Sequence, residues 1–514
     1  MKKILIYNWI PFDETENKGG GVTIYTKNLI SCLIQQGKWK VYFLSSGRAY
    51  DNRRREPYIE QTKNIFGKGC QSFQVVNSPV FSSARISFPF PQDYLEDMKL
   101  VKLLRGFLME LGGVDVLHFQ NFEGLSLRVF ILKTYFPKMK VIYSLHNYYL
   151  FCPQVMLWHA DRENCRVRCC GNQCLDCMPR DVYKGKVRFN QNYQYRLEQG
   201  NLGWNKWFWL FGKRSLEVWA VWRGWFRETI ATFRKSYLQK YEVCRRSVFQ
   251  KRREKAKYFV SVKREKRLSA CFYEFGSRNV AYLNRYVDQV LAVSERVAQI
   301  ARERGVHQEK LRVSYIGTAV AANQRSQSAY RCDGTRLTIC YLGYMRTMKG
   351  FYFLLDALEQ MEPEMAGRIG LCVASPATDQ EAYDRIQRLR EHLAEVRYYD
   401  GYTHEQLPEI LQGVHLGIVP SLWEDNLPQV AMEMKSYGVP VLSSQLGGAK
   451  ELTESEWFVF EAGNQKEFLE RLGYFLQDPG RLDDYWKGDH RLLTMEEHFR
   501  ELEQIYEDKW KCKQ

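Results

Sequence analysis

Apolar and polar residues alternate along most of this chain in blocks of two kinds. Short apolar runs with the length of buried strands are separated by longer stretches with helical spacing of apolar residues. In the first half the pattern predicts strands at KKILIYNW, KVYFLSSG, VDVLHFQ, KVIYSLH and VDQVLAV. Because strands that alternate with helices form parallel sheets with right-handed crossovers, this half predicts a Rossmann-like domain.

A second series of the same kind begins near residue 336. Its predicted strands are LTICYLG, IGLCVAS, VRYYDGY, HLGIVP and VPVLSS, again with helices between them. Residues 317–335 are polar, turn-rich and aperiodic, as expected of a linker. A chain of 514 residues is too long for one core. We therefore predict domains over 1–316 and 336–490.

The most informative stretch is VPSLWEDNLPQVAMEMKSYGVPVLSSQLGGAKEL, residues 419–452. It predicts a strand, an acidic turn, a helix, a second strand and a glycine turn. Asn426 is a residue type favoured at helix N-caps, and Pro428 suits a first helical turn. Gly438 and Pro440 are typical of the end of a helix.

Three carboxylates in this stretch are candidates for ligand binding. Glu424 and Asp425 lie in the predicted turn, and Glu433 lies two turns along the helix. A loop acid and a helix acid at this spacing can flank one pocket, at a helix N-terminus that favours anions such as a diphosphate. Carboxylates hold sugar hydroxyls by charge-assisted hydrogen bonds. The alternative is a solvated acidic turn beside a surface glutamate.

Other candidate residues lie where predicted strands give way to helices. Gly20 and Gly21 open the first helix and allow a close backbone approach to a ligand, although the segment lacks the dinucleotide fingerprint. Arg346 and Lys349 lie in a cationic turn that suits a diphosphate leaving group. The alternatives are a flexible glycine turn and a surface basic turn. His146 ends a strand at the edge where parallel sheets bind ligands.

These motifs, in this order, resemble the retaining glycosyltransferases of family 4, which have the GT-B fold. The resemblance covers broadly residues 1–180 and 281–505. It implies an α/β fold of two Rossmann-like domains, with a nucleotide-sugar donor in the cleft between them. It also implies that the last helix, within 491–514, crosses back onto the first domain.

The resemblance assigns roles to the four candidate acid and histidine residues. Asp425 stands where the family usually has Glu, and Glu424 comes one residue earlier, so either acid would hold sugar hydroxyls. Glu433 would bind the nucleotide ribose. His146 would contact the donor sugar.

The resemblance also implies how the diphosphate would be held, without a catalytic metal. Lys349 matches the family's lysine, whereas Tyr344 stands at the position of the family's arginine, so Arg346 would reach in from the turn. The backbone near the following residues would approach the donor: Gly20, Gly21, Asn426, Leu427 and Gly448.

Six of the 14 cysteines fall within residues 152–177, with the spacing C-x12-C-x3-C-C-x3-C-x2-C. The final C-x2-C is typical of a metal site, and four thiolates would form a closed structural zinc site. Similarity to relatives with four cysteines here favours Cys152, Cys165, Cys174 and Cys177. An iron–sulfur cluster and plain reduced thiols are the alternatives.

The basic charge of the chain is concentrated in residues 181–280. This segment has 24 Lys and Arg against 8 Asp and Glu. The difference of 16 positive charges equals the net charge of the whole chain. Its six tryptophans, interleaved with basic residues, favour a helix on an anionic membrane surface. A helical hairpin packed on its own domain is the second interpretation. Nucleic-acid binding is the third, and no RNA- or DNA-binding motif supports it.

Together these features predict a glycosyltransferase that moves a sugar from a UDP- or GDP-sugar to a saccharide acceptor. A membrane-bound insert would suit a lipid-linked acceptor in cell-surface polysaccharide or glycoconjugate synthesis. Other GT-B chemistry, such as nucleotide-sugar epimerisation, and a catalytically degenerate zinc- or membrane-binding scaffold are the alternatives. No apolar run approaches the roughly 18 residues of a membrane span. The N-terminus is typical of a strand, not a signal peptide, so we expect a cytoplasmic protein on the inner face of the membrane.

Overall fold

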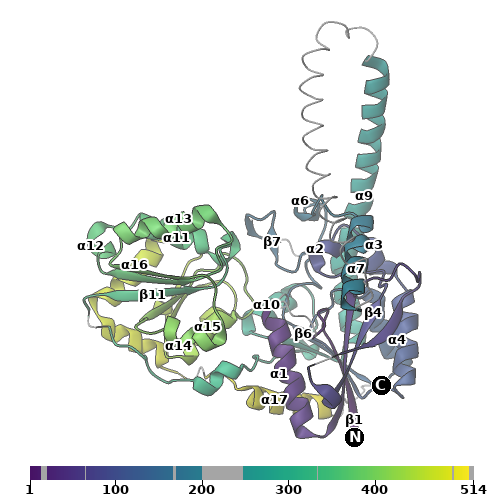
Figure 1. The fold of residues 1–514 in the computed structure, drawn as a ribbon, viewed down its shortest axis with the longest axis horizontal. Helices are drawn as coiled ribbons and strands as arrows, with labels where there is room; N and C mark the ends of the chain where they lie inside the picture. The colour runs from purple at the N-terminus through teal and green to yellow at the C-terminus, as the bar shows by residue number, and fades with distance from the viewer. Residues whose placement is uncertain are drawn as a thin grey trace.

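The computed structural model describes residues 1–12, 20–63, 65–165, 170–199, 247–332, 334–488 and 491–508, with the backbone alone over 247–264. Two sheets dominate these residues, each flanked by helices (Figure 1). One sheet is built from residues before the predicted linker, and the other from residues after it. The domain boundaries drawn from the sequence stay a prediction.

The first sheet has eight strands in the order β10-β9-β6-β5-β1-β2-β4-β3. All neighbouring pairs are parallel except β3 and β4. The strands are β1 (Lys2–Tyr7), β2 (Trp39–Ala49), β3 (Tyr58–Thr62), β4 (Cys70–Val76), β5 (Val116–Phe119), β6 (Lys140–Leu145), β9 (Gln289–Ala292) and β10 (Leu311–Val313).

The helices around this sheet are α1 (Gly20–Gln36), α2 (Ala84–Ser87), α3 (Pro91–Glu96), α4 (Lys99–Glu110), α5 (Leu132–Tyr135), α7 (Lys184–Glu198), α9 (Ser247–Tyr286) and α10 (Glu295–Glu303). Asp97 separates α3 from α4, since its backbone is extended and its carboxylate accepts the Leu100 amide at 3.0 Å. α10 begins after Ser294, whose hydroxyl caps the helix by accepting the Val297 amide.

The second sheet has six parallel strands in the order β13-β12-β11-β14-β15-β16. They are β11 (Leu337–Leu342), β12 (Ile369–Ala374), β13 (Glu395–Tyr399), β14 (Leu416–Val419), β15 (Val441–Ser444) and β16 (Val459–Phe460). Helices α11 (Phe351–Glu359), α12 (Pro363–Ala366), α13 (Gln380–Arg388), α14 (Leu407–Ile410), α15 (Gln429–Ser436) and α16 (Gln465–Gln477) accompany them. Every residue of β11 and β12 is buried, as expected of strands that helices cover on both faces.

The C-terminal helix α17 (Met495–Glu507) packs on α1 of the first domain (Figure 1). Thr494 and Glu497 form a reciprocal capping box at its start. Along the helix, His498 meets the Tyr25 hydroxyl at 2.7 Å, and the Tyr506 hydroxyl meets His118 at 2.8 Å. The chain therefore returns to the first domain after completing the second.

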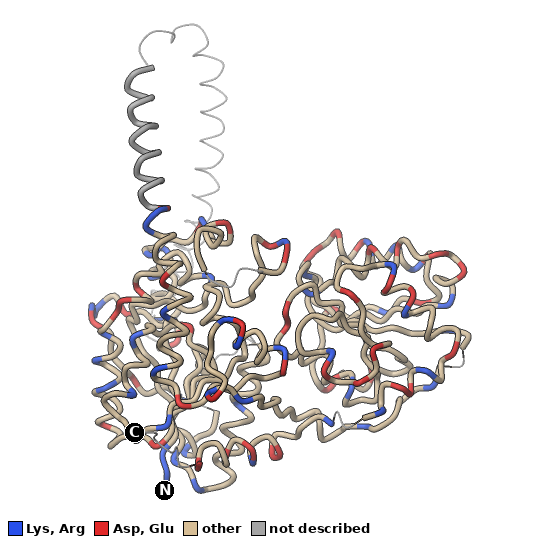
Figure 2. Tube along the Cα trace, turned by 180° about the vertical axis from the view of Figure 1, so that it is seen from behind, with Lys and Arg blue, Asp and Glu red and all other residues tan. Residues whose placement is uncertain are grey.

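The basic segment over 181–280 is described only in part. α7 lies in it, and the C-terminal half of α9 packs on α3, with Phe272 and Phe275 buried. The six tryptophans lie outside the described residues, so the structure does not test their membrane, packing or nucleic-acid interpretations. Among the helices that are described, none is long and apolar enough to cross a bilayer. Figure 2 shows acidic and basic residues interspersed over both domains.

Candidate active site

The loop between β14 and α15 carries three successive polar residues that are buried. Glu424, Asp425 and Asn426 are each less than a tenth exposed. Buried charges and amides must be paired to offset the loss of hydration. Each of the three has a different partner, and these partners define the site.

Glu424 pairs across the domain boundary. The Arg296 guanidinium of α10 reaches both of its carboxylate oxygens, with Nε at 3.0 Å and Nη2 at 2.5 Å. The backbone amide of Gly447 donates to the same carboxylate at 3.0 Å. These bonds use Glu424 to join the two domains.

Asp425 faces a different cation. The Lys349 ammonium donates to its Oδ2 at 2.5 Å and lies 5.2 Å from the centre of the Trp423 ring. Two predicted site residues from separate turns are thus brought together. Both turns follow strands of the second sheet at their carboxyl ends, where ligands of parallel sheets bind.

Asn426 does not cap α15, contrary to the sequence prediction. The helix begins at Gln429, and Pro428 holds the N-cap position without a side-chain cap. The Asn426 side-chain amide instead donates to the Leu145 carbonyl at 3.2 Å. The backbone carbonyl of Asn426 accepts the Ser294 hydroxyl. Asn426 thus bonds to the first domain and not to the start of α15. The next residue, Leu427, is buried.

Glu433 is buried on α15 and held by two side chains from the loop after β13. The Tyr402 hydroxyl donates to one carboxylate oxygen at 2.8 Å, and His404 Nε2 meets the other at 2.9 Å. The hydrogen bond to Glu433 raises the pKa of His404. Sequence reasoning missed both partners, since neither belongs to a motif.

The glycine turn after β15 supports the acidic loop. Gly447 has φ +73°, and a Cβ on it would lie 2.1 Å from the Asp425 carbonyl oxygen. A Cβ on Gly448 would lie 2.4 Å from the Asn426 carbonyl oxygen. Only glycine allows these two turns to pack together.

The N-terminal turn of α1 approaches the same place from the first domain. The Gln429 amide donates to the Gly21 carbonyl at 3.3 Å, and a Cβ on Gly21 would collide with that side chain. Gly20 has open space around it. The structure therefore brings the predicted glycine loop next to the start of α15.

His146 lies at the carboxyl end of β6 on the first-domain side of the site. Its Nε2 bonds to the Gln120 Oε1 at 2.9 Å, and the Tyr25 ring lies 4.7 Å from its ring. Burial, assisted by His498, lowers the pKa of His146 to about 3, so the imidazole is neutral. His118, by contrast, is fully buried between Tyr506 and Ser144, as expected of a structural residue.

Several buried polar groups at this edge have no hydrogen-bond partner among the described residues. They are Gln120 Nε2, Thr23 Oγ1 and the Tyr148 hydroxyl. Glu123, in the loop after β5, is buried as well, and burial raises its pKa to about 7. Its polar sequence context, QNFEG directly after a strand, was the signal that could have indicated it.

Arg346 lies at the rim of the site. It is exposed, and its guanidinium lies 5.5 Å from the centre of the Tyr344 ring, which is itself exposed. Lys349, three residues later, is half-buried beside Asp425. The two predicted cations are thus held differently.

The cysteine loop does not assemble the predicted metal site. Cys152 and Cys174 are buried, Cys165 and Cys177 are half-buried, and all four are free thiols. The Cys177 sulfur accepts the Ala160 amide at 3.2 Å. Within the described part of the chain, no three His, Cys, Asp or Glu side chains could hold a metal ion. Zinc binding is therefore not shown and stays a prediction.

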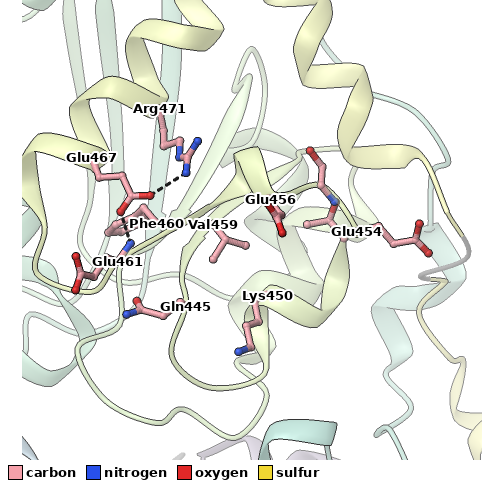
Figure 3. Close-up of a pocket in the computed structure, with 11 residues that line it drawn as sticks. Gln445, Lys450, Glu454, Glu456, Val459, Phe460, Glu461, Glu467 and Arg471 are labelled. Atoms are coloured by element: carbon pink, nitrogen blue, oxygen red, sulfur yellow. Dashed lines mark hydrogen bonds and ion pairs between the residues drawn. The ribbon is translucent and has the colours of Figure 1, made fainter.

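A separate hollow of about 440 Å³ opens on the second domain (Figure 3). Gln445 and Lys450 line it on either side of the glycine turn, and Glu467 points toward Arg471, with which it forms an ion pair at 2.8 Å. It contains none of the predicted donor residues. The hollow is therefore distinct from the predicted donor site around Asp425.

Comparison with known families identifies the second domain. Residues 323–490 match the model of a family described as glycosyl transferases group 1. The match covers 168 of the 514 residues. The prediction that it is a glycosyltransferase is thereby confirmed. No curated protein matches the chain.

Solved glycosyltransferases share the fold of this chain over nearly its whole length. Sucrose-phosphate synthase from Thermosynechococcus elongatus has a TM-score of 0.54 and 13% identity, covering 98% of both chains. HepE from Anabaena, solved with UDP and glucose, has a TM-score of 0.52 and 12% identity, and the match covers 99% of this chain and 100% of HepE. A UDP-forming trehalose-phosphate synthase from Burkholderia xenovorans has a TM-score of 0.51 and 14% identity, and the match covers 98% of both chains. The predicted GT-B fold is confirmed.

Proposed function

We propose that the protein is a retaining glycosyltransferase that moves a sugar from a nucleotide sugar to a saccharide acceptor. One observation carries the proposal. The Asp425–Lys349 pair and the neutral His146 both lie just after strand ends, and Asn426, next to Asp425, bonds to the Leu145 carbonyl, next to His146. A diphosphate, a ribose and a sugar need a cation, a carboxylate and neutral hydrogen-bonding groups, which Lys349, Glu433 and His146 would supply.

Lys349 is the group that would neutralise the diphosphate as it leaves. Its ammonium bonds to Asp425 in the structure. A bound diphosphate would share this cation, and Asp425 would then turn its free oxygen to a sugar hydroxyl. We assign the sugar to Asp425 and not to Glu424, because Arg296 and the Gly447 amide already engage Glu424.

Glu433 is suited to the ribose. Its two oxygens each accept one bond, from Tyr402 and His404, and a carboxylate oxygen can accept a second. The ribose hydroxyls would use these remaining acceptor positions. Tyr402 and His404 hold the carboxylate in one orientation, so its geometry exists before the nucleotide arrives.

His146 would position the transferred sugar as a neutral hydrogen-bonding group. If Gln120 Oε1 accepts from Nε2–H, the Nδ1 atom is free to accept from a sugar hydroxyl. A neutral ring avoids placing a full positive charge beside the cationic transition state of sugar transfer. The low pKa of His146 supports this role.

UDP is the nucleotide that we propose for the donor. Two similar proteins support it: HepE was solved with UDP and with UDP-glucose, and the trehalose-phosphate synthase is UDP-forming. A thermal-shift screen of UDP, GDP, ADP and their sugars tests the proposal, since a ligand of the native state raises the unfolding midpoint. A shift with GDP alone would replace UDP, and no shift with any nucleotide would refute donor binding.

The acceptor that we propose is a lipid-linked saccharide at the cytoplasmic face of a membrane. The surplus of 16 positive charges over residues 181–280 supports an anionic surface as partner. Flotation with vesicles of neutral lipid, and with vesicles containing anionic lipid, tests this. Equal recovery with both would refute the electrostatic part of the proposal.

Retention of configuration is proposed from the family resemblance. Proton NMR of the first product formed would show the same anomeric configuration as the donor. Turnover of the donor without an acceptor would instead favour epimerisation or hydrolysis. Binding of the nucleotide sugar without any turnover would favour a scaffold, for which Tyr344 in the arginine position is the supporting observation.

A structural zinc ion on the cysteine loop stays a separate proposal. It requires Cys152, Cys165, Cys174 and Cys177 to approach one another more closely than their present arrangement, which holds no metal group. Elemental analysis of protein purified without chelator would find about one zinc per chain. Finding none would leave the reduced thiols.

A further inference from the structure

We propose that Arg296 of the first domain is a positioning residue for sugar transfer. Through its ion pair with Glu424 it holds the loop that carries Asp425, so that the donor site is complete only when the two domains are closed. This inference rests on the proposed function, because it concerns the same donor site. α10, which carries Arg296, lies at the junction of the two domains (Figure 1).

The Arg296–Glu424 pair has the geometry of a fixed clamp. Two guanidinium nitrogens contact two carboxylate oxygens, at 3.0 and 2.5 Å. Such a planar, two-bond contact sets orientation as well as distance. The Gly447 amide occupies a further acceptor position of Glu424, and Gln299 accepts from Arg296 Nη1 at 2.9 Å. The charges are therefore paired and directed at each other.

Two sets of hydrogen bonds surround the pair and join the same elements. On the loop side, Asn426 bonds to Ser294 and to the Leu145 carbonyl, one residue before His146. On the helix side, the Glu451 carboxylate accepts the backbone amides of Glu295 and Arg296, at 2.9 and 2.8 Å. Second-domain groups thus hold both the N-terminus of α10 and the strand end that carries His146.

Burial makes the clamp sensitive to the loss of one partner. Glu424 is less than a tenth exposed, and the buried Tyr148 hydroxyl interacts with the charges of Glu424, Asp425 and Arg296. A charge in such surroundings is stabilised by its partner far more than a surface charge is. Without Arg296, Glu424 would have to regain water, which would move the loop or open the domains.

Asp425 must follow any movement of Glu424, because the two residues share a peptide bond. The Asp425 amide donates to the Trp423 carbonyl at 2.8 Å, and the Gly448 amide donates to the Asp425 carbonyl at 2.9 Å. The loop is thus a rigid turn. Opening it would carry Asp425 away from Lys349 and from the sugar, while Glu433 and its partners belong to the second domain and would keep the nucleotide.

The test is Arg296→Gln in the full-length protein, with two readouts. We expect kcat for sugar transfer to fall about 30-fold or more, as expected for loss of one partner of a buried pair, while the Kd for UDP changes by less than about 3-fold. Small-angle scattering without ligand should show a larger radius of gyration, because the domains open. Glu424→Gln should give the same pattern, and the double variant should add little to either single one.

Arg302→Gln is the matched control. Arg302 lies on the same helix in an exposed contact with Glu295 at 3.9 Å, and its loss should change neither readout. Unchanged kcat in Arg296→Gln would overturn the proposal, and so would loss of UDP binding together with loss of folding, which would make the pair purely structural. If the wild-type protein fails to bind nucleotide, the proposed function fails. The scattering comparison would still support or overturn the clamp.

Discussion

The two domains present different kinds of groups at the candidate site. On the second domain, Asp425 is paired with Lys349, and Glu433 with His404 and Tyr402. On the first domain, Arg296 is paired with Glu424, His146 is uncharged, and several buried amide and hydroxyl groups have no partner among the described residues. Apart from Arg296, the first-domain groups named here are thus neutral hydrogen-bonding groups, whereas the second domain presents ordered charges.

This difference follows from what each side would bind. A nucleotide diphosphate carries charge, so its site must supply a cation, and the ion pair with Asp425 keeps the Lys349 ammonium in place for it. A sugar offers hydroxyls, which neutral donors and acceptors satisfy at lower desolvation cost. The predictions below change one side at a time, beginning with the largest expected effect.

Lys349→Ala should remove the charge that stabilises the leaving diphosphate. We expect kcat to fall by about 1,000-fold, the upper end of what loss of one stabilising group costs. Steady-state kinetics with a saturating donor measures this. Lys466→Ala, which removes an exposed lysine of the same domain, is the control. A fall of less than about 10-fold would exclude Lys349 from the chemical step.

Glu433→Ala should remove the ribose contact and leave His404 without its partner. We expect the Kd for UDP to rise about 100-fold or more, by calorimetric titration, because a charge-assisted contact is lost in a buried site. Glu470→Ala, on the exposed face of α16, should bind like the wild type. Unchanged affinity in Glu433→Ala would refute the ribose assignment.

Glu123→Gln tests whether the first-domain side tolerates charge. Burial raises the pKa of Glu123 to about 7, above its ordinary value of 4.5. The native state therefore holds the proton more tightly than the unfolded state, and the wild type loses stability as pH rises from 4.5 to 7.

The glutamine variant cannot ionise and should escape this loss. We expect the free energy of unfolding of the variant, relative to that of the wild type, to increase by about 1 to 3 kcal/mol between pH 4.5 and pH 8. Urea unfolding at both pH values measures this. The Asn147 amide, which donates to Glu123 at 3.3 Å, can turn to accept from the new side chain. A difference that does not vary with pH would show that Glu123 ionises freely in the native state.

His404→Gln should have the smallest effect. Glu433 raises the pKa of His404, so the stabilisation from this pair is full below about 6.5, the ordinary value. It is lost as pH rises through the folded-state pKa. Because the imidazole is nearly half exposed, we expect only about 0.3 kcal/mol, seen as a pH-dependent difference in thermal unfolding between the variant and the wild type. Parallel curves from pH 6 to pH 9 would contradict the pairing.

Much of the fold was determined by the sequence alone. The apolar runs predicted the central strands of both sheets, because strands covered on both faces must be apolar throughout. The spacing of Asp425 and Glu433 and the glycines after β15 predicted one ligand site. Where local signals compete, helix boundaries are harder to predict: Asp97 separates α3 from α4, because its side chain accepts the Leu100 amide.

Only the tertiary structure distinguishes the two adjacent acids of the loop before α15. Glu424 and Asp425 are adjacent and chemically alike, and their local sequence cannot tell them apart. Glu424 forms an ion pair with Arg296, 128 positions away in the sequence. Asp425 forms an ion pair with Lys349, 76 positions away. The same holds for Asn426, whose side chain bonds to the Leu145 carbonyl, 281 positions away, and does not cap α15. Spacing along the chain determines local structure, but a buried polar group is satisfied by whichever partner folding brings within reach.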